Sequence, residues 1–111
     1  MDRKVILSDL VELAKPLDEI LINLKRLAWD SEVPLVTLEQ RHLASVIRRY
    51  LDGKLSSEAV EVWANAVEGR DDIGYEPDTF VARLLHELAN PRLTAPLTRE
   101  RAAELLERRL V

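Results

Sequence analysis

Residues 56–69, SSEAVEVWANAVEG, decide the fold class of this chain. Val60, Trp63, Ala64 and Val67 recur at helical spacing, so their side chains share one face of a helix. Either of the two leading serines can cap the N-terminus of that helix, and the closing glycine favours its end. The stretch therefore predicts a helix over 57–69 that packs through Trp63.

Helical periodicity continues on both sides of this stretch. Leucine, alanine, glutamate and arginine are abundant, and β-branched residues do not alternate over the length of a strand. The expected helices span about residues 6–29, 38–52, 57–69, 78–89 and 99–110, with a connection over 30–37. We therefore predict an all-α, four- to five-helix bundle in a single domain, 1–111.

A few residues set the expected ends of these helices. Pro16 would kink the first segment or split it into two helices, with Pro16 in the first turn of the second. Thr37 and Gln40 have the spacing of a capping box for the helix that follows. Gly53 can adopt the left-handed conformation that ends a helix, and Pro77–Asp78 are expected to open the next one.

Length and composition restrict the class of protein. A chain of 111 residues, 47% apolar and 32% charged, suits one folded domain. Cysteine is absent, which removes disulfides, thiolate nucleophiles and cysteine-based metal sites. Acidic residues interrupt the N-terminal apolar stretch, and no segment approaches the roughly 20 apolar residues of a membrane span. We therefore expect a cytoplasmic protein that has no membrane partner.

The sequence contains no recognisable catalytic or metal-binding motif. Its two histidines, His42 and His86, lack a second histidine or a carboxylate at the spacing of a known metal site. His86 lies beside a core stripe, where a hydrogen-bonded structural role is expected ahead of a catalytic one. We expect no enzyme activity, no metal and no cofactor.

Negative charge is concentrated between Glu58 and Asp78. This range holds seven acidic residues and one arginine, a net charge of −6, whereas the whole chain carries −4. Glu58, Glu61, Asn65 and Glu68 follow one another at steps of three and four, which places them on one helix face. Clustered like charges repel one another, so their concentration needs an explanation.

We interpret the acidic stretch as a docking surface for a basic protein partner. The negative electric field of clustered carboxylates speeds the encounter with a cationic protein, and it favours partners whose charges are complementary. Tyr75 is the preferred aromatic anchor, with Trp29 and Tyr50 as further candidates. The alternative is a solvated surface in which Asp71 or Asp78 caps a helix. The expected contact residues are Glu58, Glu61, Asn65, Glu68, Asp71, Asp72, Tyr75 and Glu76.

Three phrases form a longer pattern over about residues 43–110: YLDGKLSSEAVEVWA (50–64) with the acidic turn after it, FVARLLHEL (80–88) and ERAAELLERRL (100–110). The pattern resembles the colicin D-type immunity proteins, helical bundles with which bacteria neutralise a co-produced tRNA-cleaving toxin. The resemblance implies that carboxylates fill the toxin's basic catalytic groove in place of tRNA phosphates. The residues implied here are Glu61, Glu68, Asp71, Asp72 and Glu76. Segments 6–29 and 63–76 have no counterpart in the pattern, and another bacterial helical family would account for the same residues.

Two other functions stay open on sequence grounds: a helix-turn-helix-like DNA-binding regulator, and an oligomeric structural protein. The helices around the turn LDGKLSS (51–57) can pass for a helix-turn-helix, with Arg41, Arg48 and Arg49 touching phosphate. The second of these helices begins with carboxylates, so its charges argue against nucleic acid. The apolar stripe of segment 6–29 is wide enough for self-association, and a homodimer is therefore the second alternative.

Overall fold

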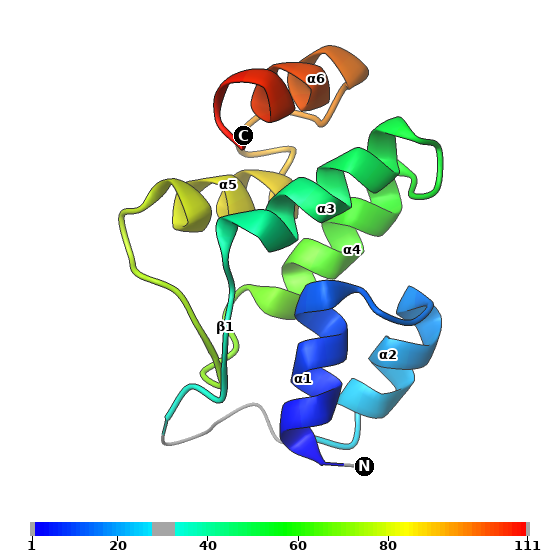
Figure 1. The fold of residues 1–111 in the computed structure, drawn as a ribbon, viewed down its shortest axis with the longest axis vertical. Coiled ribbons are helices and arrows are strands. Elements are labelled where there is room, and N and C mark those ends of the chain that lie inside the picture. Colours follow the sequence, from blue (N-terminus) through cyan, green and yellow to red (C-terminus); the bar gives the residue numbers. More distant parts are fainter. Residues whose placement is uncertain (1, 28–32, 111) are drawn as a thin grey trace.

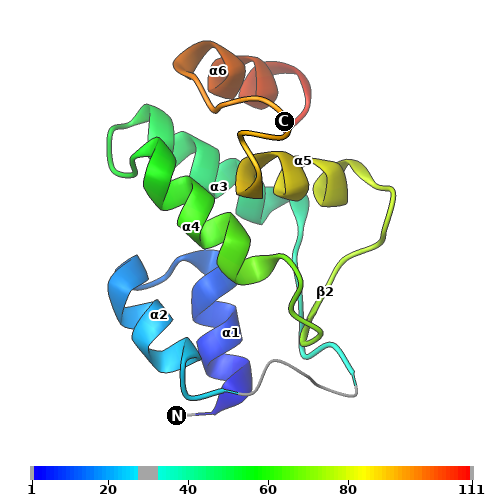
Figure 2. The ribbon, with the colours of Figure 1, turned by 180° about the vertical axis from the view of Figure 1, so that it is seen from behind.

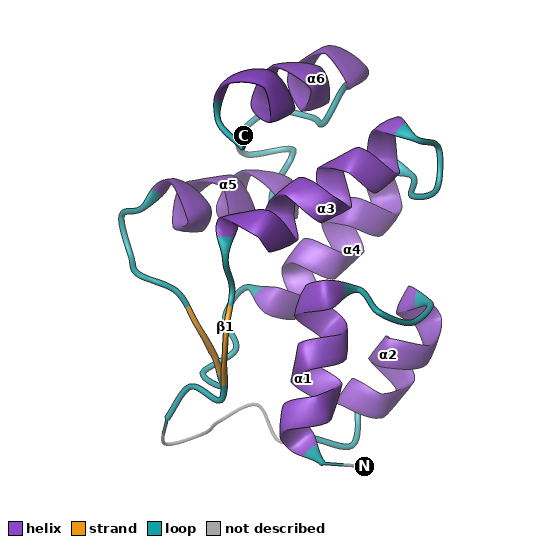
Figure 3. Cartoon of the chain, viewed as in Figure 1, coloured by secondary structure: helices purple, strands orange, loops and turns teal. Residues whose placement is uncertain are grey.

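Helix caps and a proline break divide the described residues into six helices. The computed structural model describes residues 2–27 and 33–110. Within these ranges the helices are α1 (Arg3–Glu12), α2 (Leu17–Leu24), α3 (Gln40–Leu51), α4 (Ser57–Val67), α5 (Phe80–Ala89) and α6 (Arg99–Arg108). Figure 3 shows that loops and one short strand pair join them. The all-α prediction is confirmed, with six helices in place of four or five.

The helices pack mainly as three pairs. α1 lies against α2, α4 against α5, and α3 against α6. In Figures 1 and 2, α3 and α4 run side by side across the middle, with α1 and α2 at one end and α6 at the other. The radius of gyration is 13.4 Å, close to the value of about 13 Å for one domain of this length. The helices therefore form one compact unit.

Trp63 lies in the centre of the core, as the sequence predicts. Its side chain is fully buried, and its indole Nε1 donates a 2.7 Å hydrogen bond to the carbonyl oxygen of Leu10. This bond satisfies the one polar atom of the ring and joins α4 to α1. Other fully buried side chains include those of Leu7, Leu43, Ile47, Leu84, Leu85 and Leu105.

The first segment is split into two helices. α1 ends at Leu13, which has a left-handed φ of 49°, and the Leu13 N–H bonds back to the carbonyl of Leu10. Pro16 is the N-cap of α2, one position before the expected first turn. Arg49 of α3 donates a 2.6 Å hydrogen bond to the carbonyl oxygen of Leu13. This bond satisfies a backbone acceptor at the end of α1, where the left-handed residue is more often a glycine.

A short parallel strand pair joins the loop before α3 to the loop after α4. β1 (Val36–Thr37) pairs with β2 (Ile73–Gly74). A Cβ on Gly74 would lie 3.0 Å from the Cβ of Pro34, so a larger residue there would force Pro34 to move by a few tenths of an ångström. The sequence does not predict the pair, because two residues are too few to show an alternating pattern.

The predicted start of α3 is wrong. Thr37 lies in β1, and the N-cap is Glu39. The imidazole Nδ1 of His42 accepts a 2.9 Å hydrogen bond from the Glu39 N–H, so Glu39 and His42 replace the expected pair of Thr37 and Gln40. The histidine therefore has a structural role at this helix end.

The other helix ends follow the sequence more closely. Ser56 caps α4 and Thr98 caps α6, each through its side-chain oxygen. Gly53 follows α3 with a left-handed φ of 78°. The start of α5 is an exception: Asp78 has a φ of 63° and is not helical, so Thr79 is the N-cap.

Candidate functional site

Helix α4 carries two carboxylates that no basic side chain neutralises within the described residues. Glu58 is exposed and Glu61 is partly buried. Together with Glu87 of α5 they line a hollow of about 150 Å³. The other walls include Leu88, Pro91, Pro96 and Leu97. Carboxylates beside apolar walls suit a lysine or arginine side chain, whose stem is apolar and whose end is cationic.

Glu87 belongs to this hollow although the sequence does not single it out. Arg101 of α6 donates to both of its carboxylate oxygens, at 3.0 and 2.9 Å. The hydrogen bond to Glu87 is the main reason that the pKa of Arg101 rises above its ordinary value. Because Glu87 is already paired, the uncompensated negative charge of the hollow comes from Glu58 and Glu61.

Asn65 and Glu68 lie on the predicted face of α4 but bond within the molecule. The Asn65 amide donates to the carbonyl oxygen of Ala89 at 3.0 Å. One oxygen of Glu68 lies 2.9 Å from the His86 Nδ1, and the other accepts from the Asn90 amide at 3.2 Å. These bonds join α4 to α5, and they agree with the hydrogen-bonded role expected of His86.

The prediction that Asp72 belongs to an exposed acidic surface is wrong. Its side chain is fully buried, and it accepts hydrogen bonds from Arg70 at 2.9 and 3.0 Å and from Arg3 at 2.8 Å. Burial raises the pKa of Asp72, but the hydrogen bonds and charge of Arg70 and the bond from Arg3 outweigh it and leave the pKa below its ordinary value. Asp72 therefore joins α1 to the loop beside β2.

The remaining loop residues divide between core and solvent. Asp71 and Glu76 are exposed, as a docking surface requires. Tyr75, the preferred aromatic anchor, is partly buried and packs against the core. Burial, followed by the charge of Glu68, raises the pKa of the Tyr75 hydroxyl, although a hydrogen bond with the Gly69 backbone opposes the rise. Tyr75 therefore presents only part of its ring to a partner.

The two further aromatic anchors do not extend this surface. Trp29 lies outside the described residues. Tyr50 is partly buried against the core, and its hydroxyl donates a 3.4 Å hydrogen bond to the carbonyl of Leu97. Aromatic contacts therefore do not define the site.

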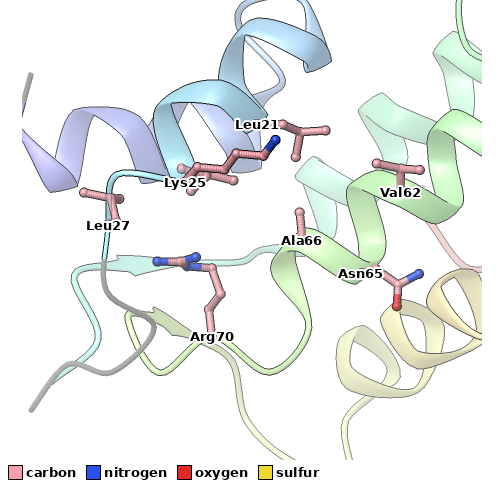
Figure 4. Close-up of a pocket in the computed structure, with 8 residues that line it drawn as sticks. Leu21, Lys25, Leu27, Val62, Asn65, Ala66 and Arg70 are labelled. Carbon is pink, nitrogen blue, oxygen red and sulfur yellow. The ribbon is translucent and has the colours of Figure 1, made fainter.

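An apolar groove of about 470 Å³ runs between α4 and α2. In Figure 4, Val62 and Ala66 point from α4 toward Leu21 of α2, whereas Asn65 points toward α5. Val62 is 44% exposed although it lies among the acidic positions of α4. The outer face of α4 thus combines unpaired carboxylates with exposed apolar surface.

The three arginines of the helix-turn-helix alternative do not form a free basic row. Arg41 binds Glu12 at 2.6 Å, and this hydrogen bond is the main reason that the pKa of Glu12 lies below its ordinary value. Arg49 is turned toward the carbonyl oxygens at the end of α1. Arg48 is exposed. This arrangement does not favour a helix that reads nucleic acid through these side chains.

The wide apolar stripe of α1 and α2 is used mostly within the molecule. Leu10, Leu13, Ile20 and Leu24 are buried. Leu17, Leu21 and Leu27 are partly buried and pack against the core. Because these apolar side chains pack within the molecule, the width of the stripe is explained without a second copy of the chain.

Comparisons with other proteins do not extend this description. No family model, curated protein or solved structure matches the chain. Across residues 2–27 and 33–110, no three histidine, cysteine or acidic side chains are placed to hold a metal ion. None of the helices described above is both long enough and apolar enough to cross a bilayer.

Proposed function

We propose that this chain is a non-enzymatic protein-binding module that docks a basic partner on the outer face of α4. The observation that carries the proposal is the pair Glu58 and Glu61, whose charges have no basic partner in the described part of the chain. Val62 lies between them and the groove beside α2, so a partner that brings both cationic and apolar side chains would fit. We call Glu58, Glu61 and Val62 the α4 surface.

The more specific form of the proposal is an immunity-like inhibitor of a basic, tRNA-cleaving bacterial toxin. It rests on the resemblance of residues 43–110 to colicin D-type immunity proteins. Among the carboxylates that the resemblance implies, Glu61, Asp71 and Glu76 reach the surface at least in part, whereas Asp72 is buried and Glu68 is bonded to α5. The inhibitory carboxylates would therefore come from Glu58, Glu61, Asp71 and Glu76.

Capture from the native host, followed by mass spectrometry, tests the proposal. The affinity of the captured chain is then measured for the wild type, for Glu58→Lys with Glu61→Lys, and for the matched control Glu100→Lys with Glu107→Lys on α6. All four glutamates reach the solvent, so the two double variants make the same change of charge on different helices. We expect the α4 variant to weaken binding at least about tenfold, or ~1.4 kcal/mol, and the α6 variant to bind nearly normally.

Equal weakening by both double variants would show only a general charge effect and would contradict the proposal. Val62→Asp should also weaken binding, whereas Val5→Asp on α1 should not, because Val5 is 47% exposed, close to the 44% of Val62, and lines neither the hollow nor the groove. If the captured chain is a ribonuclease, its cleavage of tRNA with and without this protein tests the inhibitor form. Sedimentation of the purified chain tests the rival: a dimer that Val62→Asp dissociates would assign the α4 surface to a second copy.

A further inference from the structure

A second hollow, distinct from the α4 surface, is lined by cations. It has a volume of about 440 Å³ and lies where the connection between α1 and α2 meets the turn between α3 and α4. Figures 1 and 2 show this corner on the opposite side of the molecule from the loop that contains β2. Lys15, Arg49 and Lys54 line it, and none of the acidic side chains that the structure describes does.

Arg49 is fixed in this hollow by backbone groups. It donates to the carbonyl oxygens of Leu13 at 2.6 Å and of Glu12 at 3.4 Å. A guanidinium has five N–H donors, so these two bonds leave three free, and carbonyl acceptors do not cancel its charge as a carboxylate would. The protein therefore holds a guanidinium in place with donors to spare.

The two lysines add to this charge from separate segments. Lys54 makes no ion pair within the described ranges, and its backbone N–H is fixed by a 2.9 Å bond to the carbonyl of Arg49. The Nζ of Lys15 lies 3.3 Å from the Oδ2 of Asp9, and this ion pair compensates one of the three positive charges that line the hollow. Two positive charges therefore remain for a ligand.

We propose that this hollow binds the phosphate group of a small phosphate monoester. A phosphate monoester carries a charge of about −1.5 to −2 at neutral pH, which matches the two uncompensated cations. Its oxygens would bond to Arg49 and Lys54. Apolar walls that include Leu13, Leu17 and Leu55 would cover the organic part. This proposal is independent of the α4 surface.

A single phosphate fits better than a nucleic acid strand. The surface next to the hollow is acidic: Asp18 and Glu19 are exposed in the first turn of α2, and Asp52 is exposed in the turn after α3. A strand would bring further phosphates against these carboxylates. The hollow itself is lined by cations and flanked by these carboxylates, which suits one anionic group.

A titration with phenyl phosphate at pH 7.5 and constant ionic strength, monitored through the NMR chemical shifts of the backbone amides, tests the proposal. We expect saturable shifts confined to residues 13–17 and 49–55. Lys54→Gln should weaken binding roughly tenfold, since it removes one charge-assisted hydrogen bond. Lys25→Gln is the matched control, because Lys25 is exposed at the other end of α2. Arg49 is left intact because it also caps α1.

Shifts that do not saturate, or equal weakening by Lys54→Gln and Lys25→Gln, would overturn the proposal. Inorganic phosphate should bind at the same amides but more weakly than phenyl phosphate. Equal affinity would overturn the assignment to a monoester. A single-stranded oligonucleotide that bound more tightly than phenyl phosphate, and lost that binding in Lys54→Gln, would assign the hollow to nucleic acid instead.

Discussion

The carboxylates of the acidic stretch divide into two groups with opposite structural roles. In the solvent-facing group, Glu58 and Glu61 project from α4 and form no ion pair within the described chain, and Asp71 is exposed in the loop. In the group that holds the fold together, Glu68 is hydrogen-bonded to α5 and Asp72 is buried between two arginines. Similar residue types thus serve a surface in one group and the fold in the other. The difference shows that a concentration of charge in sequence is not by itself a surface.

The largest effect expected from this comparison is at Asp72. Asp72→Asn would remove the buried carboxylate that accepts two hydrogen bonds from Arg70, which is only 5% exposed. Breaking a buried ion pair from one side costs about 3–5 kcal/mol, so urea unfolding should show a loss of that size. Asp71→Asn is the matched control, because Asp71 is exposed and should change the free energy of unfolding by less than about 0.5 kcal/mol. Similar losses in both variants would contradict the division into a solvent-facing group and a group that holds the fold together.

Acid should act through the same buried residue. The pKa of Asp72 in the folded chain lies below its ordinary value of 3.8, so the unfolded chain binds a proton more readily. Its contribution to stability is present above pH 3.8 and is lost as the pH falls toward the folded pKa. Unfolding monitored from pH 7 to 2 should show a decline in this range that Asp71→Asn retains and Asp72→Asn reduces. An unchanged pH dependence in Asp72→Asn would exclude Asp72 as its source.

Glu68 should show an intermediate effect, since its hydrogen bonds join two helices at a partly exposed position. A double-mutant cycle with Glu68→Ala and Asn90→Ala isolates their interaction from changes in helix propensity. The coupling energy should be about 0.5–1 kcal/mol, measured by urea unfolding. A coupling energy of zero would place Glu68 in the solvent-facing group.

The smallest effect is expected for the α4 surface itself. Glu58→Gln with Glu61→Gln removes two charges that have no basic partner in the described structure. The free energy of unfolding should change by no more than about 0.5 kcal/mol. A larger loss of stability would mean that these carboxylates serve the fold, and would remove the distinction on which the proposed docking surface rests.

The interior of the helices could be predicted from the sequence because their packing follows a local period. Val60, Trp63 and Val67 share the buried face of α4, and Glu58 lies on the opposite face, as helix geometry requires. The ends of helices were less predictable. The sequence predicts that Asp78 helps to open a helix, but its backbone adopts a left-handed conformation, which a right-handed helix excludes.

The residues of the site could be predicted only where the helical period applies, on the outer face of α4. The burial of Asp72 depends on Arg3, 69 positions away in the chain, and no local pattern shows that contact. Glu87 was missed for a related reason, since only the packing of α5 on α4 brings it beside Glu58 and Glu61. Contacts between distant segments therefore set the limit of the sequence analysis.

The parallel pair of β1 and β2 has a consequence for the order in which the molecule opens. It joins Val36 to Ile73, so its formation closes a long loop, whereas helix turns close short ones. The Leu38 N–H donates to Gly74 at 2.9 Å across this junction, and Leu38 is only 3% exposed. We expect its amide to exchange with deuterated solvent before that of Trp63, because a local opening of the two loops need not disturb the helices.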